Sequence, residues 1–132
     1  MKIIVCMEDH GGMMFNRRRV SSDAVVLQRI LEISHGENLW MSPYSAKLFK
    51  GETVCIAEDF LLCAQTGDYC FVEDADISDC LEHIEELILF RWNRRYPSDL
   101  KFSLSLDNWK RISTEEFVGK SHPLITQEVY VR

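Results

Sequence analysis

The sequence lacks an apolar run long enough to cross a membrane, which takes roughly 20 residues as a helix. The opening stretch Lys2–Met7 is apolar but short, and His10, Gly11 and Gly12 interrupt it before a signal-peptide cleavage site could form. We therefore expect a soluble, cytoplasmic protein with no membrane partner.

Paired-cysteine motifs are absent as well. The sequence has five cysteines, an odd number, and none stands in a Cys-x-x-Cys spacing: Cys6, Cys55, Cys63, Cys70 and Cys80. This pattern argues against both a disulfide framework and a zinc ribbon. Since Cys6, Cys55 and Cys70 lie inside short apolar runs, we expect buried free thiols.

Familiar catalytic signatures are also missing. There is no Gly-x-Ser-x-Gly elbow and no Walker loop. The four histidines, His10, His35, His83 and His122, stand far apart in the sequence and lack the spacing of a zinc hydrolase. We predict no metal site, while Cys–His catalysis stays an alternative because distant residues can meet in space.

Positive charge is in short supply. The formal net charge is -6 and the pI about 5.2, whereas nucleic-acid binding requires a basic surface that neutralises phosphates. We expect no nucleic-acid partner, and any site for an anion must be local.

What the sequence does contain is an alternation of strand and helix patterns along a single predicted domain, residues 1–132. The strands are predicted at 3–7, 38–42, 53–57, 69–73, 84–91 and 102–106, with a loop at 13–19. The helices are predicted at 21–35, 43–49, 58–65 and 78–83, and an antiparallel hairpin at 109–117 and 127–132. This order is typical of an α/β fold with a mostly parallel central sheet, flanking helices and an antiparallel C-terminal hairpin.

Several segments resemble dihydrofolate reductase in order. The Ile3-Ile4-Val5 strand, with Asp9 to Met13 and Asn16-Arg17 after it, is similar to that family's first strand and mobile substrate loop. Further matches are the helix start Val20-Ser21-Ser22-Asp23, the strand Leu39-Trp40-Met41-Ser42, the Tyr96-Pro97 turn, Asp107-Asn108-Trp109, and the closing Glu128-Val129-Tyr130-Val131-Arg132. The resemblance implies a dihydrofolate reductase-like fold over nearly the whole chain, in a shortened and divergent form.

The chain departs from that family where the family binds its cofactor. The family's strand corresponding to Tyr69–Val72 is followed by a glycine pair that lets the backbone approach the dinucleotide phosphates, but here Glu73-Asp74-Ala75-Asp76 follows. The family's Gly-Arg at the end of its second strand is replaced by Ser42-Pro43. We therefore predict no cofactor, with NADPH as the alternative.

Asp23 and the arginines before it are the candidate site residues. The resemblance places Asp23 in the segment whose acidic residue contacts the pterin, and a carboxylate there could hold a protonated heterocycle. The alternative is that Asp23 caps the helix. Arg17, Arg18 and Arg19 could bind a phosphate or carboxylate of a small ligand, or form a solvated charged turn.

Two further charged clusters admit a ligand or a purely structural role. Arg91, Arg94 and Arg95 with Trp92 and Tyr96 could form an anion or stacking patch, or balance acidic neighbours. The acidic stretch, which comprises Glu73, Asp74, Asp76 and Asp79, lacks the spacing of a calcium loop, and we predict a solvated loop.

The leading functional hypothesis is a reductase-like domain that has lost its cofactor site and binds an unknown small molecule or a protein partner, including a second copy through exposed apolar surface. The alternative is a divergent oxidoreductase acting on a pterin or pyrimidine-like substrate. In that alternative Asp23 polarises the substrate and Arg17 to Arg19 hold its anionic group. A subunit role in a larger complex is a third hypothesis.

Overall fold

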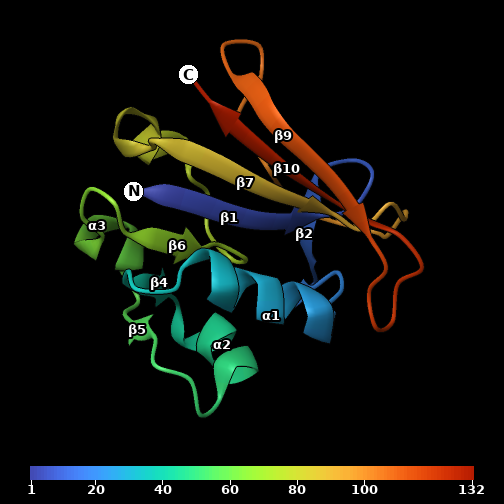
Figure 1. Ribbon diagram of the computed structural model, residues 1–132, viewed down its shortest axis with the longest axis horizontal. Coiled ribbons are helices and arrows are strands. Elements are labelled where there is room, and N and C mark those ends of the chain that lie inside the picture. The colour runs from blue at the N-terminus through green and yellow to red at the C-terminus, as the bar shows by residue number, and fades with distance from the viewer.

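The computed structural model describes residues 1–132 (Figure 1). The strands are β1 (Lys2–Met7), β2 (Gly12–Phe15), β3 (Arg18–Arg19), β4 (Leu39–Met41), β5 (Cys55–Ile56), β6 (Tyr69–Phe71), β7 (Glu86–Arg91), β8 (Leu100–Lys101), β9 (Lys110–Phe117) and β10 (Ile125–Val131). The helices are α1 (Ala24–Ile33), α2 (Pro43–Ala46) and α3 (Phe60–Cys63), with 3₁₀ turns η1 (Lys47–Phe49) and η2 (Ser78–His83).

Seven strands form the main sheet in the order β5-β4-β6-β1-β7-β10-β9. The pairs from β5 to β7 are parallel, whereas β10 pairs antiparallel with both β7 and β9. The predicted mostly parallel sheet with an antiparallel C-terminal hairpin is therefore confirmed. Figure 1 shows this hairpin, in orange and red, at one side of the sheet.

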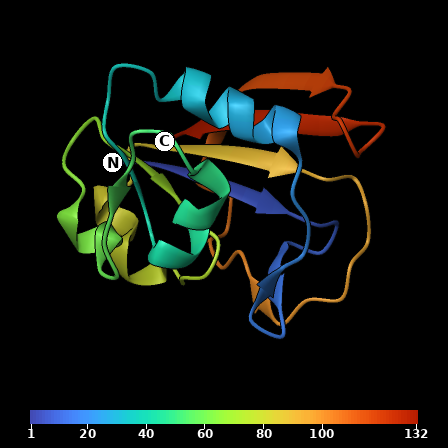
Figure 2. The ribbon, with the colours of Figure 1, turned by 90° about the horizontal axis from the view of Figure 1, so that it is seen from below.

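The central position of β1 follows from its unbroken apolar sequence. Ile3, Ile4 and Val5 have no exposed surface, because side chains alternate between the two faces and both faces are covered. Ile3 and Val5 belong to one apolar cluster with Leu87, while Ile4 belongs to the other, beneath α1. Figure 2 shows α1 lying along one face of the sheet.

Helix α1 begins and ends close to the predicted positions. Asp23 is its N-cap, since the side chain accepts a hydrogen bond from the backbone N–H of Val25. The helix stops at Ile33, two residues before the predicted end, and Ser34 bonds back to the carbonyl of Ile30 through both its backbone N–H and its hydroxyl. The three following strand–helix steps occur in the predicted order. Their strands and α3 are shorter than predicted, whereas the helix predicted at 43–49 is α2 followed by η1, and the one predicted at 78–83 is the 3₁₀ turn η2.

The predicted loop at 13–19 is wrong in part, because β2 and β3 form a hairpin there. Phe15 pairs with Arg18, and the two residues between them, Asn16 and Arg17, have φ values of 50° and 62°. Such a two-residue turn has the twist that a hairpin requires. With β8 on the other side of β2, the hairpin makes a second, three-stranded sheet.

The predicted strand at 102–106 is also wrong, although its alternating burial is correct. Phe102, Leu104 and Leu106 are half-buried against the cluster that contains Ile3, while Ser103 and Ser105 are exposed. Only Leu100 and Lys101, in β8, pair with another strand. The segment therefore covers the core as extended chain without extending the sheet.

The cysteines are all free thiols. Of the five, only Cys70 is fully buried, so the expectation that Cys6 and Cys55 are buried as well is wrong. Burial raises the pKa of Cys70 to about 12, which keeps this thiol protonated at neutral pH.

None of the helices has the length and apolar character that crossing a bilayer requires. Large apolar side chains are exposed on several separate elements: Phe15, Ile56, Leu62, Leu81, Ile112, Val118 and Leu124. Self-association stays a prediction.

The extended segment after β8 gives a test of the fold. Replacing Leu104 by alanine should lower the free energy of unfolding by about 1–2 kcal/mol, below the range for a fully buried leucine because this side chain is only half-buried. Denaturant unfolding measures the loss. Ser105→Ala is the matched control and should change stability by less than about 0.5 kcal/mol; equal losses would contradict the packing described.

Candidate functional site

The carboxyl ends of four parallel strands meet at one edge of the sheet. The residues that follow these strands are buried polar or aromatic ones: Glu8 after β1, Ser42 after β4, Glu73 near the end of β6 and Trp92 after β7. The N-terminus of α1 lies beside them, since Ser21, Ser22 and Asp23 line a small cavity together with Glu73 and Trp92. In open α/β sheets, ligands bind in the crevice outside this edge.

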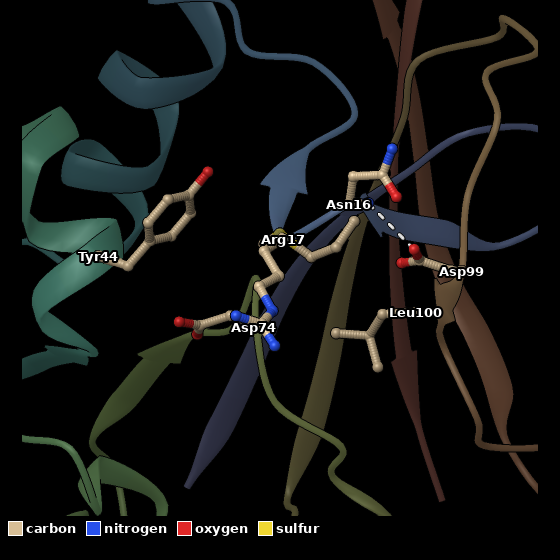
Figure 3. Close-up of a pocket in the computed structure, with 7 residues that line it drawn as sticks. Asn16, Arg17, Tyr44, Asp74, Asp99 and Leu100 are labelled. Atoms are coloured by element: carbon tan, nitrogen blue, oxygen red, sulfur yellow. Dashed lines mark hydrogen bonds between the residues drawn. The ribbon is translucent and has the colours of Figure 1, made fainter.

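The β2–β3 hairpin stands over this edge, and its turn separates two cavities of about 490 Å³ each. This volume falls in the range of small-molecule sites. The mixed-charge cavity is lined by Met14, Asn16, Arg17, Tyr44, Asp74, Asp99 and Leu100 (Figure 3). The arginine cavity is lined by Phe15, Asn16, Arg18, Arg19, Val20, Tyr96 and Pro97.

The three arginines predicted to act together are separated by the hairpin. Arg17 lines the mixed-charge cavity, and Arg18 and Arg19 line the arginine cavity. Arg17 and Arg18 are exposed, and neither guanidinium forms an ion pair. The three arginines therefore do not line one common cavity. The ligand-binding role of each stays a prediction.

Arg19 and Glu73 form a largely buried ion pair. The guanidinium donates to both carboxylate oxygens, at 2.8 and 3.1 Å, and lies 4.4 Å from the ring centre of Tyr44. Burial alone would lower the pKa of Arg19, but the hydrogen bond and charge of Glu73 outweigh it and raise that pKa. Ser45 also donates its hydroxyl to Glu73, at 2.8 Å.

The acidic stretch was predicted to be a solvated loop, and its first residue, Glu73, departs from that prediction. Glu73 is buried, at 7% exposure, whereas Asp74 and Asp76 are exposed. Asp74 accepts a hydrogen bond from Ser42 at 3.0 Å, and Asp76 accepts one from Ser103 at 2.8 Å. No group of three or more potential metal ligands comes together anywhere in the chain.

Asp23 is buried, with 3% exposure. Its carboxylate oxygens accept hydrogen bonds from several groups within the protein. Besides Val25, it accepts hydrogen bonds from the backbone N–H groups of Lys120 and Ser121, from the Ser121 hydroxyl, and from Nδ1 of His122 at 2.9 Å. This geometry favours the capping alternative, and a contact with a pterin-like ligand stays a prediction.

His122 is a site residue that the sequence analysis missed. Its ring is buried, stacks on Trp92 with ring centres 4.5 Å apart, and places Nε2 2.8 Å from the hydroxyl oxygen of Ser21. The Tyr96 hydroxyl lies 3.5 Å from the same nitrogen. Ninety-nine positions separate Asp23 from His122, and no local sequence signal predicts their contact.

The predicted patch of Arg91, Arg94 and Arg95 with Trp92 and Tyr96 does not line one cavity. Arg91 forms an ion pair with Glu128 at 2.5 Å, which favours the charge-balancing alternative for this residue. Trp92 is buried, and only Tyr96 of the cluster lines the arginine cavity.

No family model and no curated protein matches the sequence. Among solved structures, the chain is similar to a dihydrofolate reductase from Enterococcus faecalis complexed with NADP(H) and RAB-propyl, with a TM-score of 0.70 and 12% sequence identity. The match covers 99% of this chain and 95% of that one. The chain has a dihydrofolate reductase-like fold.

Within the dihydrofolate reductase-like fold, the residues at the strand ends do not fit a dinucleotide cofactor. Glu73 stands where the resemblance implies a glycine pair, and its buried carboxylate holds Arg19 there. Ser42 and Pro43 supply no cation, and the Ser42 hydroxyl is turned to Asp74. A diphosphate at this edge would meet the carboxylates of Glu73 and Asp74, the first of them buried, and the Arg19 guanidinium that is already paired. The exposed Arg17 lines the mixed-charge cavity together with Asp74.

The pKa of Asp23 gives a test of its capping role. Burial would raise it, but the hydrogen bonds from His122, Lys120, Ser121 and Val25 prevail and hold it far below the ordinary value. The ionised form is therefore favoured in the folded state. Its stabilising effect is complete above the unfolded pKa of about 3.9 and is lost as the pH falls toward the folded pKa.

We expect Asp23→Asn to lower the free energy of unfolding by about 2 kcal/mol or more at neutral pH, because the charge-assisted hydrogen bonds are weakened. Urea unfolding at several pH values measures this. The difference between the two proteins should shrink below about pH 4; a difference that is constant down to pH 2 would contradict the assignment.

Proposed function

We propose that the protein binds a small anionic molecule in the arginine cavity and does not work as an NADPH-dependent reductase. The observation that carries this proposal is the exposed guanidinium of Arg18, which forms no ion pair and lines a cavity that has no carboxylate in its lining. The parallel N–H donors of one guanidinium match two oxygens of a carboxylate or phosphate.

The rest of the arginine cavity supports a small ligand with one anionic end. Tyr96 and Phe15 offer aromatic surface, and Val20 and Pro97 offer aliphatic surface, close to the arginines. Apolar walls with a few charged groups are typical of small-molecule sites. The mixed-charge cavity suits an anion less well, because Asp74 and Asp99 line it together with Arg17.

The Arg19–Glu73 pair supports the second half of the proposal. Binding of a nucleotide diphosphate would require this pair to break, and separating a buried pair leaves a charge without its partner, at a cost of roughly 3–5 kcal/mol. NADPH should therefore cause no saturable quenching of the fluorescence of Trp40, Trp92 and Trp109 at micromolar concentrations. Saturable quenching would contradict the proposal.

The anion site is tested with inorganic phosphate, followed by the NMR signals of the arginine side-chain Nε–H groups. Phosphate should shift the signal of Arg18 in a saturable manner, whereas the Nε–H of Arg19 is already bound to Glu73. Arg18→Ala should weaken binding about tenfold, which corresponds to ~1.4 kcal/mol of charge-assisted hydrogen bonding. An equal concentration of chloride controls for ionic strength.

Arg17→Ala is the matched control, since Arg17 is the neighbouring residue and carries the same charge but lines the other cavity. Its affinity for phosphate should stay within about twofold of the unchanged protein. Equal weakening by both substitutions would indicate general charge attraction and would refute the arginine cavity as the site.

A further inference from the structure

Three polar side chains near the arginine cavity are arranged in a line. The Ser21 hydroxyl oxygen lies 2.8 Å from Nε2 of His122, and Nδ1 of the same ring lies 2.9 Å from a carboxylate oxygen of Asp23. These are the shorter contacts of the two ring nitrogens, since the Tyr96 hydroxyl lies 3.5 Å from Nε2 and the Ser121 hydroxyl 3.2 Å from Nδ1. In a neutral imidazole whose proton is on Nδ1, Nε2 is the acceptor for the serine O–H.

We propose that Ser21, His122 and Asp23 form a catalytic triad that transfers the acyl group of a small ester, with Ser21 as the nucleophile. Serine, histidine and aspartate in this geometry occur on unrelated folds and are recognised by geometry and role, not by sequence position. The preference for an anionic ester rests on the proposed function, because it depends on the arginine cavity.

Asp23 and His122 are held in place by their surroundings. The backbone N–H groups of Lys120 and Ser121 fix the Asp23 carboxylate, and Trp92 stacks on the imidazole. A buried, ionised Asp23 keeps the proton of His122 on Nδ1 and stabilises the imidazolium that forms during the reaction. Asp23 and His122 thus serve as orienting carboxylate and general base.

Ser21 is accessible in a way that its two partners are not. Its side chain is half-buried, whereas Asp23 and His122 are buried. Val20, the residue before it, lines the arginine cavity. Tyr96 lines that cavity too, and its hydroxyl lies 3.5 Å from Nε2 of His122. An ester in the arginine cavity would therefore lie next to the nucleophile and its base.

Trp92 supplies an independent observation. Its Nε1 is the one buried side-chain nitrogen or oxygen without a hydrogen-bond partner, although the residue is only 1% exposed. Trp92 and Ser21 line the same small cavity beneath the start of α1. That cavity measures only about 10 Å³, too small for a carbonyl group, so Trp92 packs against the triad and leaves one buried donor unsatisfied beside it.

The reaction balances with water as the only co-reactant. Ser21 Oγ forms a bond to the ester carbonyl carbon while His122 Nε2 takes the hydroxyl proton. The bond from that carbon to the alcohol oxygen then breaks, and His122 gives the proton to the leaving alcohol. Water repeats the two steps on the acyl-serine, so that a carboxylic acid leaves and Ser21 recovers its proton.

A neutral alkyl fluorophosphonate tests the triad, because it reacts with activated serines without needing an anion site. The full-length protein should gain the mass of one adduct, mapped to Ser21 by peptide mass spectrometry. Ser21→Ala should abolish the adduct. Ser22→Ala removes the hydroxyl of the exposed neighbour and is the matched control; it should keep labelling within about twofold.

His122→Gln should slow labelling of Ser21 by roughly 10²–10⁴-fold, the usual contribution of a general base, and thermal unfolding shows whether the variant is folded. No adduct on the unchanged protein, or an adduct that persists in Ser21→Ala, would overturn the triad. The phosphate experiment is separate: labelling without phosphate binding would refute the anion site alone, and phosphate binding without labelling would refute the triad alone.

Discussion

The buried carboxylate of Asp23 is the contact on which the geometry of the carboxyl edge depends. Burying a carboxylate costs several kcal/mol unless other groups replace its hydration, and here backbone N–H groups, a hydroxyl and an imidazole do so. Two of those N–H groups belong to the loop between β9 and β10. The loop is therefore fastened to the start of α1, and His122 is placed against Trp92.

This attachment also explains a glycine in the same loop. A Cβ atom on Gly119 would lie 2.5 Å from a carboxylate oxygen of Asp23 and 2.7 Å from the side chain of Ile125, which is closer than real Cβ atoms approach such neighbours. The backbone must pass this close for the N–H groups of Lys120 and Ser121 to reach the carboxylate. The buried charge thus constrains residues nearly a hundred positions away.

The pair of Arg19 and Glu73 is a second buried charge contact and changes the character of the sheet edge. A dinucleotide site at the end of a parallel strand offers open backbone N–H groups to phosphate. In this chain a carboxylate stands at that place, and it is neutralised by a guanidinium from the hairpin and a hydroxyl from α2. The buried charges of Arg19 and Glu73 at this edge are therefore paired with each other. The unpaired positive charges of the hairpin are those of Arg17 and Arg18.

The sequence predicted the elements whose signals are local, and missed those that depend on distant contacts. The apolar run Ile3-Ile4-Val5 identified the central strand, and Asp23 identified the start of α1. The β2–β3 hairpin was missed because Asn16-Arg17 is a weaker turn signal than Asn-Gly. The strand predicted at 102–106 has the right alternation, but the sequence does not say whether an extended segment finds a partner strand.

The candidate site was harder to predict than the fold for the same reason. Asp23 and the arginines were identified as charged residues near a helix start, yet the partner of each depends on the tertiary structure. Arg19 meets Glu73 across 54 positions and Ser21 meets His122 across 101. A search for motifs of fixed spacing does not detect such pairs, since spacing within one segment carries no information about which loop packs against it.

The net charge of -6 sets a condition on any anion that reaches the hairpin. Screening at physiological salt limits the repulsion from distant carboxylates to about 8 Å, so the nearby charges decide whether an anion binds. A small anion within reach of Arg18 meets an unpaired guanidinium, whereas a polyanion would extend over the acidic remainder of the surface. Under the proposed function, this local arrangement suits a small ligand better than an extended polyanion, and the proposed triad at the start of α1 borders the cavity that would hold that ligand.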